Sequence, residues 1–179
     1  AIAEAVDVVL AAVDRASRPH RLSGSTTILI DGRSGAGKTS LAAALAQRLP
    51  APVQVVHLDE AYPGWDGLES GAEAVIAEVL RARAKGEPGQ VPTWDWHRSV
   101  PGIYRPLTPG GTLVVEGVGI LRESAAQLAD VTVWVAAPDD LRKHRALTRD
   151  GDAYVAHWDR WARQEDEYIA VHDPQARAQ

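Results

Sequence analysis

The sequence predicts an α/β fold, a three-layer α/β/α domain around a mainly parallel β-sheet. The runs over residues 26–31 and 112–117 are almost continuously apolar, as is typical of strands that are buried on both faces. Segments with apolar residues at helical spacing separate these runs, and strands that alternate with helices form parallel sheets covered on both sides. Because the chain shows no internal repeat, we expect one domain over residues 1–179.

The expected elements alternate along the chain. The first residues read as an amphipathic helix, and a polar connector with Pro and Gly over residues 17–25 separates this helix from the first strand. In chain order, we expect helices over residues 1–16, 38 to about 49, 69–85, 118–129, 139–149 and 152–170, and strands over residues 26–31, 53–58, 112–117 and 130–138.

Composition and charge restrict the classes of partner. The net charge of −5 argues against nucleic acid as the main partner. The absence of cysteine excludes disulfides and thiolate zinc sites. No apolar run approaches the roughly 20 residues of a membrane-spanning helix, and the first residues lack the basic segment of a signal peptide. We therefore expect a cytoplasmic protein without a membrane partner, and formation of a homo-oligomer stays open.

Residues 32–39 read Gly-Arg-Ser-Gly-Ala-Gly-Lys-Thr, which fits the phosphate-binding P-loop pattern in full, including the strand before it and the helix after it. In such a loop the backbone N–H groups surround an anion, Lys38 reaches the outer phosphates, and the Thr39 hydroxyl binds magnesium. A tight turn with glycines by chance is the alternative, and the Lys-Thr pair argues against it. The residues expected to bind ATP and Mg²⁺ are Gly32, Arg33, Ser34, Gly35, Ala36, Gly37, Lys38, Thr39 and Ser40.

Other classes of P-loop protein lack their motifs here. The guanine-reading Asn-Lys-x-Asp of GTPases and the Leu-Ser-Gly-Gly-Gln signature of transport ATPases do not occur in the sequence. The chain is also short for a motor ATPase. Small-molecule kinases remain, in which a second substrate lies beside the γ-phosphate.

Acidic residues follow two of the expected strands. Asp59 and Glu60 come after the strand over residues 53–58, and Glu116 lies near the end of the strand over residues 112–117. Ligands of open parallel sheets bind beyond the carboxyl ends of the strands. A carboxylate there can accept the proton of an attacking hydroxyl or hold a magnesium-bound water, and we consider Asp59 and Glu116 for these roles. The alternative is that both cap a helix. Glu60 is interpreted as an exposed neighbour.

Two further segments are expected to close the site. The Pro- and Gly-rich segment over residues 86–110 is long for a structureless loop, so we expect it to form an acceptor-site insertion. The basic segment over residues 139–153 is expected to form a lid. Arg145 and Arg149 are four residues apart and share one helix face, which either covers the triphosphate or is a solvated helix face.

The insertion contains a cluster of aromatic and polar residues. Trp94 and Trp96 can stack on a base or close an apolar pocket, or they can anchor the loop. Asp95 can hold a substrate hydroxyl or form an Asx turn. His97 and Arg98 can contact polar groups of the substrate, although His97 also fits a plain surface histidine.

Five motifs in order carry a resemblance to a known family. The segments GRSGAGKTS, HLDEAYPGWDGL, PTWDWHRS, TLVVEGVGIL and LRKHRALTRD together resemble the uridine kinase-like branch of P-loop kinases. This branch includes uridine-cytidine kinases, phosphoribulokinase and bacterial pantothenate kinase. The resemblance extends from about residue 25 to residue 177. The P-loop is specific for nucleotide binding, whereas the weight of the other motifs comes from their order and spacing.

The resemblance implies a role for each matching residue. Asp59 would be the catalytic base and Tyr62 a wall of the substrate pocket. The Trp94–Trp96 segment, with Asp95 at its centre, would line the nucleoside site. Glu116 would be associated with magnesium, and the arginines of the lid would cover the triphosphate.

The sequence departs from the family pattern in three places. Trp94 stands where the family has Tyr, and the His that follows this motif lies nearer, at His97. The lid continues directly into GDAYVAHW without a further Arg-rich turn. The chain ends about where a last strand of the family begins.

We therefore expect a magnesium-dependent kinase that transfers the γ-phosphoryl group of ATP to a hydroxyl of a small molecule, with a nucleoside as one candidate. Asp59 would accept the hydroxyl proton, and Lys38, Arg145 and Arg149 would offset charge on the transferred group. The alternatives are a nucleotide-binding regulatory module without transfer activity and an NTP hydrolase that needs no acceptor.

Two groups of residues are interpreted as structural. His57 lies on a strand expected to be buried and is interpreted as a core histidine with satisfied hydrogen bonds. The residues of a C-terminal stripe at helical spacing are interpreted as core packing: Tyr154, Trp158, Trp161, Glu165 and Tyr168.

Overall fold

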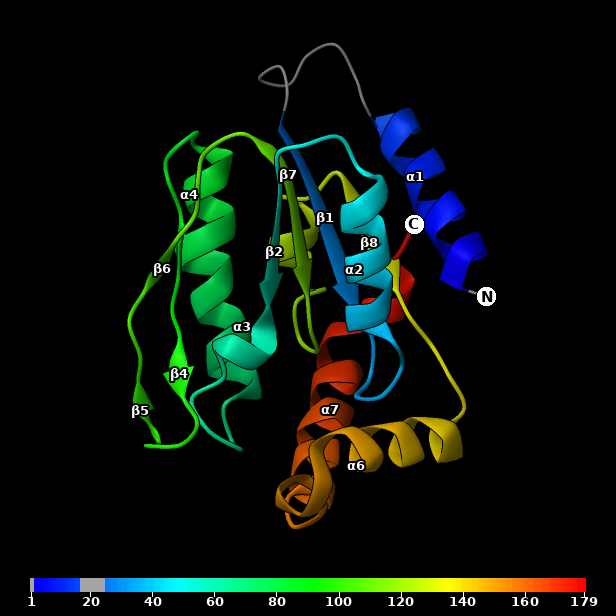
Figure 1. Ribbon diagram of the computed structural model, residues 1–179, viewed down its shortest axis with the longest axis vertical. Coiled ribbons are helices and arrows are strands. Elements are labelled where there is room, and N and C mark those ends of the chain that lie inside the picture. Colours follow the sequence, from blue (N-terminus) through cyan, green and yellow to red (C-terminus); the bar gives the residue numbers. More distant parts are fainter. Residues whose placement is uncertain (1, 17–24) are drawn as a thin grey trace.

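Four parallel strands form the central β-sheet of the molecule (Figure 1). The computed structural model describes residues 2–16 and 25–179, apart from the side chains of residues 149, 150, 152 and 153, so most of the expected connector lies outside the described residues. The strand order β2-β7-β1-β8 with helices around it confirms the predicted α/β/α class. The strands are β1 (Ser25–Asp31), β2 (Val53–His57), β7 (Gly111–Glu116) and β8 (Val131–Trp134).

The register of the sheet brings the carboxyl ends of the strands to one edge. β7 lies between β1 and β2, and Glu116 pairs with Ile30 on one side and with His57 on the other. Asp31, the last residue of β1, pairs with Trp134 of β8. The residues that follow each strand therefore meet at the same end of the sheet, where open parallel sheets bind ligands.

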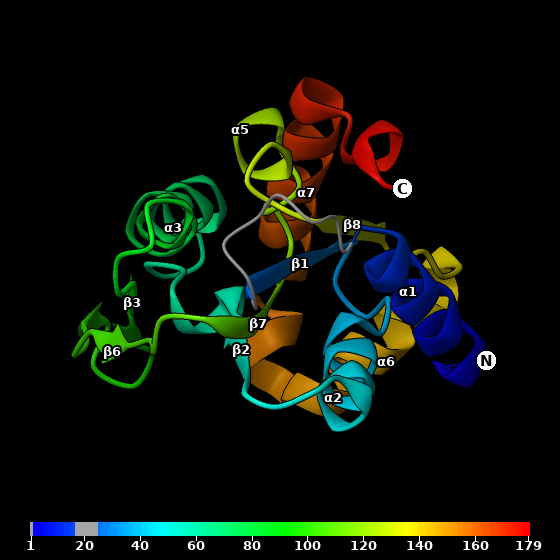
Figure 2. The ribbon, with the colours of Figure 1, turned by 90° about the horizontal axis from the view of Figure 1, so that it is seen from above.

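Helices cover both faces of the sheet (Figure 2). On the side of α1 and α2 the core contains Ile28 and Ile30 of β1, and on the side of α3, α5 and α7 it contains Leu29. Successive residues of β1 thus face opposite layers, which explains why this strand is apolar throughout. The helices are α1 (Ile2–Ala16), α2 (Lys38–Arg48), α3 (Leu68–Val75), α4 (Arg81–Ala84), α5 (Glu123–Ala126), α6 (Asp139–Val155) and α7 (Trp158–His172).

Two expected helices differ from the prediction in detail. The segment over residues 69–85 is helical throughout, but a π-helical turn (Ile76–Leu80) separates α3 from α4. The helix expected over residues 118–129 is wrong in length, because α5 has four residues. After α5 the backbone continues in tighter turns, in which Leu128 donates to the carbonyl of Ala125.

The helix of the predicted lid region is interrupted at Gly151, close to where the sequence predicts that a helix ends. α6 extends to Val155, but Gly151 within it has φ 64° and ψ −153°, a conformation that glycine adopts at little cost. The expected gap between helices at residues 150–151 falls at this break, but the helix expected over residues 152–170 is wrong in its start, because α7 begins at Trp158. Among the described helices, none is long and apolar enough to cross a membrane.

The segment expected as a long loop over residues 86–110 contains two short antiparallel pairs that extend beside α3 and α4 (Figure 1). Strands of two residues carry no readable alternation, which is why the sequence did not predict them. The pairs are β3 (Gln90–Val91) with β6 (Arg105–Pro106) and β4 (Trp94–Asp95) with β5 (Val100–Pro101).

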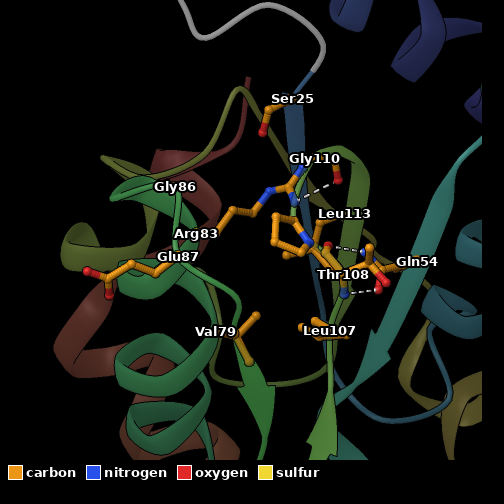
Figure 3. Close-up of a pocket in the computed structure, with 12 residues that line it drawn as sticks. Ser25, Gln54, Val79, Arg83, Gly86, Glu87, Leu107, Thr108, Gly110 and Leu113 are labelled. Carbon is orange, nitrogen blue, oxygen red and sulfur yellow. Dashed lines mark hydrogen bonds between the residues drawn. The ribbon is translucent and has the colours of Figure 1, made fainter.

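Arg83 of α4 joins the helical layer to the opposite edge of the sheet, where the strands begin (Figure 3). Its guanidinium donates to the carbonyl of Thr26 (3.1 Å), to Oγ1 of Thr27 (3.0 Å), and to the carbonyls of Gly110 (3.1 Å) and Gly111. A hollow of about 150 Å³ lies beside this side chain. One cation thus satisfies acceptors at the start of both β1 and β7.

We expect Arg83→Met to lower the free energy of unfolding by about 1–3 kcal/mol, because these acceptors lose a charged donor in a half-buried position. The matched control is Arg81→Met on the same helix, where the side chain is exposed, and its effect should stay within about 0.5 kcal/mol. Urea unfolding measures both values. Equal effects of the two substitutions would contradict the proposed role of Arg83 in holding the starts of β1 and β7 together.

Candidate active site

The main pocket of the molecule, about 700 Å³ in volume, lies at the carboxyl edge of the sheet. Its lining combines three kinds of residue: the P-loop, the polar ends of β2 and β7, and a group of aromatic side chains. The lining residues are Ser34, Gly35, Lys38, Thr39, His57, Asp59, Tyr62, Trp65, Trp96, His97, Glu116, Val118, Tyr154 and Trp161.

The P-loop turns from β1 into α2 through glycines in left-handed conformations. Gly32, Gly35 and Gly37 have φ values of 148°, 77° and 105°. A Cβ atom on Gly32 would collide with the carbonyl oxygen of Val135, so this position requires glycine. The Lys38 ammonium donates to the carbonyl of Arg33 at 3.2 Å, and α2 begins at Lys38. A curved backbone, a helix N-terminus and a lysine fit a phosphate group.

A smaller hollow of about 250 Å³ connects the P-loop to α6. Arg145 lines it together with Lys38, Thr39 and Ser40, so this predicted lid arginine lies beside the predicted phosphate site. The second predicted lid arginine, Arg149, lies in α6, and its side chain is outside the described part of the structure.

Sequence reasoning missed the arginine that holds α6 against the P-loop. Arg142 is buried, donates to the carbonyl of Ser34 at 3.0 Å and pairs with Asp139 at 2.6 Å. A Cβ atom on Gly35 would collide with the backbone of Arg142, so helix and loop are in close contact. The only sequence signal was its place in the basic run of the lid.

Glu116 joins the two strands of the pocket to the P-loop. Its Oε1 accepts hydrogen bonds from Oγ1 of Thr39 (2.9 Å) and from Nδ1 of His57 (2.6 Å). Burial raises the pKa of Glu116, but the hydrogen bond from His57, the charge of Lys38 and the hydrogen bond from Thr39 outweigh it and leave the pKa below its ordinary value. Glu116 is therefore an anion beside the hydroxyl that the sequence predicts as a magnesium ligand.

The interpretation of His57 as a core histidine is wrong. Its side chain is 39% exposed, lines the main pocket, and pairs with Glu116. The hydrogen bond to Glu116 raises the pKa of His57 in spite of partial burial. The sequence placed His57 on a buried strand, but the last residue of a strand at the carboxyl edge faces the ligand site. That terminal position was the signal that could have identified it.

The segment after β2 presents Asp59 and Tyr62 to the same pocket. Asp59 lies in a single 3₁₀ turn (Leu58–Glu60), and Tyr62 is buried with its hydroxyl donating to the carbonyl of Val118 at 2.7 Å. A side chain on Gly117 would meet Leu58 and the Tyr62 hydroxyl, which explains the glycine after Glu116. Two predicted site residues, Asp59 and Glu116, thus lie in one pocket.

Glu60 is half-buried rather than an exposed neighbour. Its carboxylate accepts two hydrogen bonds from Arg105, at 2.7 and 3.0 Å, and one from the backbone N–H of His57 at 3.2 Å. This pair ties the insertion to the end of β2. Glu60 therefore has a structural role that its position next to Asp59 did not indicate.

The insertion contributes two of its candidate residues to the pocket. Trp96 and His97 line it, and the indole N–H of Trp96 donates to the carbonyl of Asp59 at 2.9 Å. The backbone N–H groups of His97 and Arg98 donate to Asp95, which forms the Asx turn that was the alternative for this residue. Among the predicted substrate residues, Trp94, Asp95 and Arg98 are not in the described lining of the pocket.

The C-terminal stripe packs as expected but also builds the site. Trp161 and Tyr154 line the pocket, and the indole N–H of Trp161 donates to Oγ of Ser34 at 3.1 Å. Glu165, also buried, accepts the backbone N–H of Ser34 at 2.9 Å. Core packing alone was therefore too narrow an interpretation. Trp65 is a further pocket residue that sequence reasoning missed.

The donor set at Glu116 fits magnesium in the form that accompanies a nucleotide. The described side chains contain no group of three or more His, Cys, Asp or Glu residues around a common metal position. Magnesium usually takes one or two protein ligands and completes its shell with phosphate oxygens and water. The Thr39 hydroxyl and the Glu116 carboxylate, 2.9 Å apart, supply such a partial set.

Comparison with solved structures identifies the fold. A structure named as a possible uridine kinase from Bacillus stearothermophilus aligns with a TM-score of 0.63 and 21% identity, covering 99% of this chain and 94% of that one. A structure named for a fructose transport system kinase from Silicibacter sp. TM1040 aligns with a TM-score of 0.67 and 20% identity, covering 93% and 94%. No protein-family model matches the sequence, and no curated protein matches it either.

The fold is that of the uridine kinase-like P-loop kinases. The alignments extend over almost all of both chains, so the likeness is not confined to the P-loop. The resemblance inferred from the five sequence motifs is confirmed at this level. An identity of 20–21% identifies the fold and leaves the reaction to be argued from the site.

The pH dependence of stability should report the pair of His57 and Glu116. Because the pKa of His57 is higher in the folded protein than its ordinary value of about 6.5, the folded protein binds this proton more tightly than the unfolded chain. The stabilisation is fully present below the unfolded pKa and is lost as pH rises through the folded pKa. We expect the stability difference between wild type and His57→Asn to shrink as pH rises from about 6 to about 9.

The measurement is urea unfolding at a series of pH values. The matched control is His144→Asn, which removes an exposed histidine of α6 and should leave the difference from wild type flat over the same range. A flat difference for His57→Asn as well would mean that the folded protein binds the proton of His57 no more tightly than the unfolded chain.

Proposed function

We propose that this protein is an ATP-dependent kinase that phosphorylates a hydroxyl group of a small molecule, with magnesium as its cofactor. The observation that carries this proposal is the presence of Asp59 in the pocket that Lys38 and Thr39 of the P-loop also line. A base, a phosphate cradle and room for an acceptor are then adjacent. The names of the two structural neighbours, which are both kinases, agree with it.

In the proposed reaction Asp59 receives the proton of the acceptor hydroxyl. The hydroxyl oxygen forms a bond to the γ-phosphorus, and the bond between that phosphorus and the β–γ bridging oxygen breaks, so that ADP leaves with the electron pair. Magnesium bound with ATP would neutralise charge on the phosphates. Thr39 and Glu116 would hold this ion. Catalysis of this kind depends mainly on positioning and electrostatics, which the fixed P-loop and strand ends provide.

The positive groups of the proposed site lie on the phosphate side. The N–H groups of the P-loop and the Lys38 ammonium would hold the outer phosphates. Arg145, across the smaller hollow, would contact the phosphates from the lid. His57 would act as a positioning residue, because its hydrogen bond at 2.6 Å fixes the carboxylate of Glu116.

We expect Asp59→Asn to lower acceptor-dependent turnover by about 10²–10⁴-fold, because the attacking hydroxyl loses its base, while ATP affinity changes little. The assay follows ADP release from ATP, and from GTP in parallel, against a panel of nucleosides, amino alcohols and sugar alcohols. The control variant Asp159→Asn removes an exposed carboxylate of α7 and should retain full turnover.

The same assay separates the alternative functions. ATP binding without turnover across the panel would favour a regulatory module, and phosphate release without any acceptor would favour a hydrolase. Either result would overturn the proposed kinase function.

We expect Arg145→Gln to lower kcat by at least about 10-fold, and by up to about 10³-fold if Arg145 contacts the transferred group, with a small change in KM for the acceptor. The control Lys143→Gln removes a cation of the same helix that lies over the Trp158 ring. Steady-state kinetics with both substrates varied distinguish the two effects. Equal kcat values for the two variants would contradict a role of Arg145 at the phosphates.

A further inference from the structure

Aromatic rings wall one side of the pocket. Trp65 lies at the centre of this group, with Trp96 at 5.1 Å and Trp161 at 6.3 Å between ring centroids, and both rings are steeply inclined to it, at 61° and 85°. Tyr154 and His157 stack on Trp65, at 5.3 and 4.5 Å, and Tyr62 meets Trp161 edge-on at 4.8 Å. The three tryptophan rings therefore form a corner.

Hydrogen bonds hold three of these rings in place. The indole N–H of Trp96 donates to the carbonyl of Asp59, that of Trp161 donates to Ser34, and the Tyr62 hydroxyl donates to a backbone carbonyl. Fixed rings lose little conformational entropy on binding, so their faces are preorganised for a ligand. A tryptophan that served only to anchor a mobile loop would not need these hydrogen bonds.

The carboxylate on this side of the pocket is that of Asp59, whose backbone carbonyl accepts the indole N–H of Trp96. Glu116 lies on the phosphate side, where it accepts hydrogen bonds from Thr39 and His57. Among the lining residues that the structure describes, Lys38 is the single lysine or arginine, and it also belongs to the phosphate side. Nearby guanidinium groups are paired with other carboxylates: Arg105 with Glu60, and Arg160 with Asp66. An acceptor with a phosphate or carboxylate group would therefore find no described guanidinium or ammonium partner at the aromatic end.

A shift in pKa agrees with a negative potential in this region. Burial, followed by the charges of Asp59 and Asp31, holds the pKa of Tyr62 far above its ordinary value. A ligand cation would experience the field of the same carboxylates.

We propose that the phosphoryl acceptor is an alcohol that carries a protonated or quaternary amine, which the corner formed by Trp65, Trp96 and Trp161 binds through cation–π contacts. This inference rests on the proposed kinase function and names the substrate class of that site. Tryptophan provides the strongest cation–π face among the side chains, and the Asp59 carboxylate beside Trp96 adds to the attraction. The amine keeps its charge throughout the transfer, and the bonds formed and broken are those of the kinase reaction above.

Uncharged planar alcohols also stack on indole rings, but they gain nothing from the negative field. Anionic alcohols would be repelled by Asp59 and by the bound triphosphate. The proposal therefore predicts an order of affinity set by charge at constant shape: cation, then neutral molecule, then anion.

The test compares three small alcohols of similar size: (2-hydroxyethyl)trimethylammonium, its uncharged isostere 3,3-dimethylbutan-1-ol, and 4-hydroxybutanoate. Binding to the full chain without nucleotide is followed by quenching of tryptophan fluorescence and by calorimetry. We expect the cation to bind about 10-fold more tightly than its isostere, since a cation–π contact in a desolvated pocket contributes about 1–2 kcal/mol. Equal or reversed affinities would overturn the proposal.

Matched variants locate the preference. Trp65→Leu should abolish the preference for the cation, and Trp65→Phe, which keeps an aromatic face and a similar bulk, should retain part of it. Trp134→Leu on β8 removes a tryptophan outside the lining of the pocket and should leave the preference unchanged. Loss of the preference in Trp134→Leu, or its full retention in Trp65→Leu, would mean that the cation binds elsewhere. Either result would overturn the proposal that the three tryptophans bind it.

Turnover separates this inference from the proposed function. ADP release that depends on the cationic alcohol, and exceeds that with the uncharged isostere, supports both. Transfer to uncharged or anionic alcohols alone would leave the proposed kinase function intact and would overturn the inference that the acceptor carries an amine. Preferential binding of the cation without acceptor-dependent ADP release, for this alcohol and across the panel above, would overturn the kinase and with it the cation as acceptor.

Discussion

The carboxylate of Asp31, fully buried at the end of β1, is the group around which the site is assembled. It accepts hydrogen bonds from the backbone N–H groups of Gly32 (2.6 Å), Gly119 (3.2 Å) and Leu121 (2.8 Å) and from the hydroxyl of Tyr168 (2.7 Å). These donors belong to the P-loop, the loop after β7, and α7. Burial raises the pKa of Asp31, and the hydrogen bonds from Leu121, Tyr168 and Gly32 and the charge of Lys38 oppose this effect. Because a buried carboxyl without partners is costly, the three segments are held together by the need to satisfy one side chain.

The contact with Tyr168 determines where the rest of α7 lies. Trp161 and Glu165 precede it by seven and three residues on the same helix face, and both reach Ser34. α7, the helix most distant from the P-loop in sequence, therefore supplies Trp161 to the wall of the pocket and Glu165 as a hydrogen-bond acceptor for the P-loop. The same side of the helix pairs with the loop electrostatically, because Arg33 contacts Glu165 and Asp166. The phosphate loop and the aromatic wall are thus a single rigid unit.

Sequence reasoning predicted the parts of this site that depend on local pattern and on strand ends. The P-loop was readable because its glycines, lysine and threonine lie together, and Asp59 and Glu116 were readable because acids at strand ends meet at one edge. The end of a strand marked His57 as a residue of the ligand edge, but its pairing with Glu116 depends on a register that no local pattern encodes. Trp65 was missed for the same reason: its partners Trp96 and Trp161 come from the insertion and from α7.

The insertion has a consequence for the choice between transfer and hydrolysis. A kinase must bring an alcohol to the γ-phosphate while keeping water from the same position, and closed apolar walls achieve this exclusion. Trp96 is bonded to the backbone of Asp59, and Arg105 of the same insertion holds Glu60 beside it. The segment that carries the proposed base is therefore fastened to the segment that walls the acceptor. In the proposed kinase, the two short strand pairs that the sequence did not reveal would hold the wall that keeps water from the γ-phosphate.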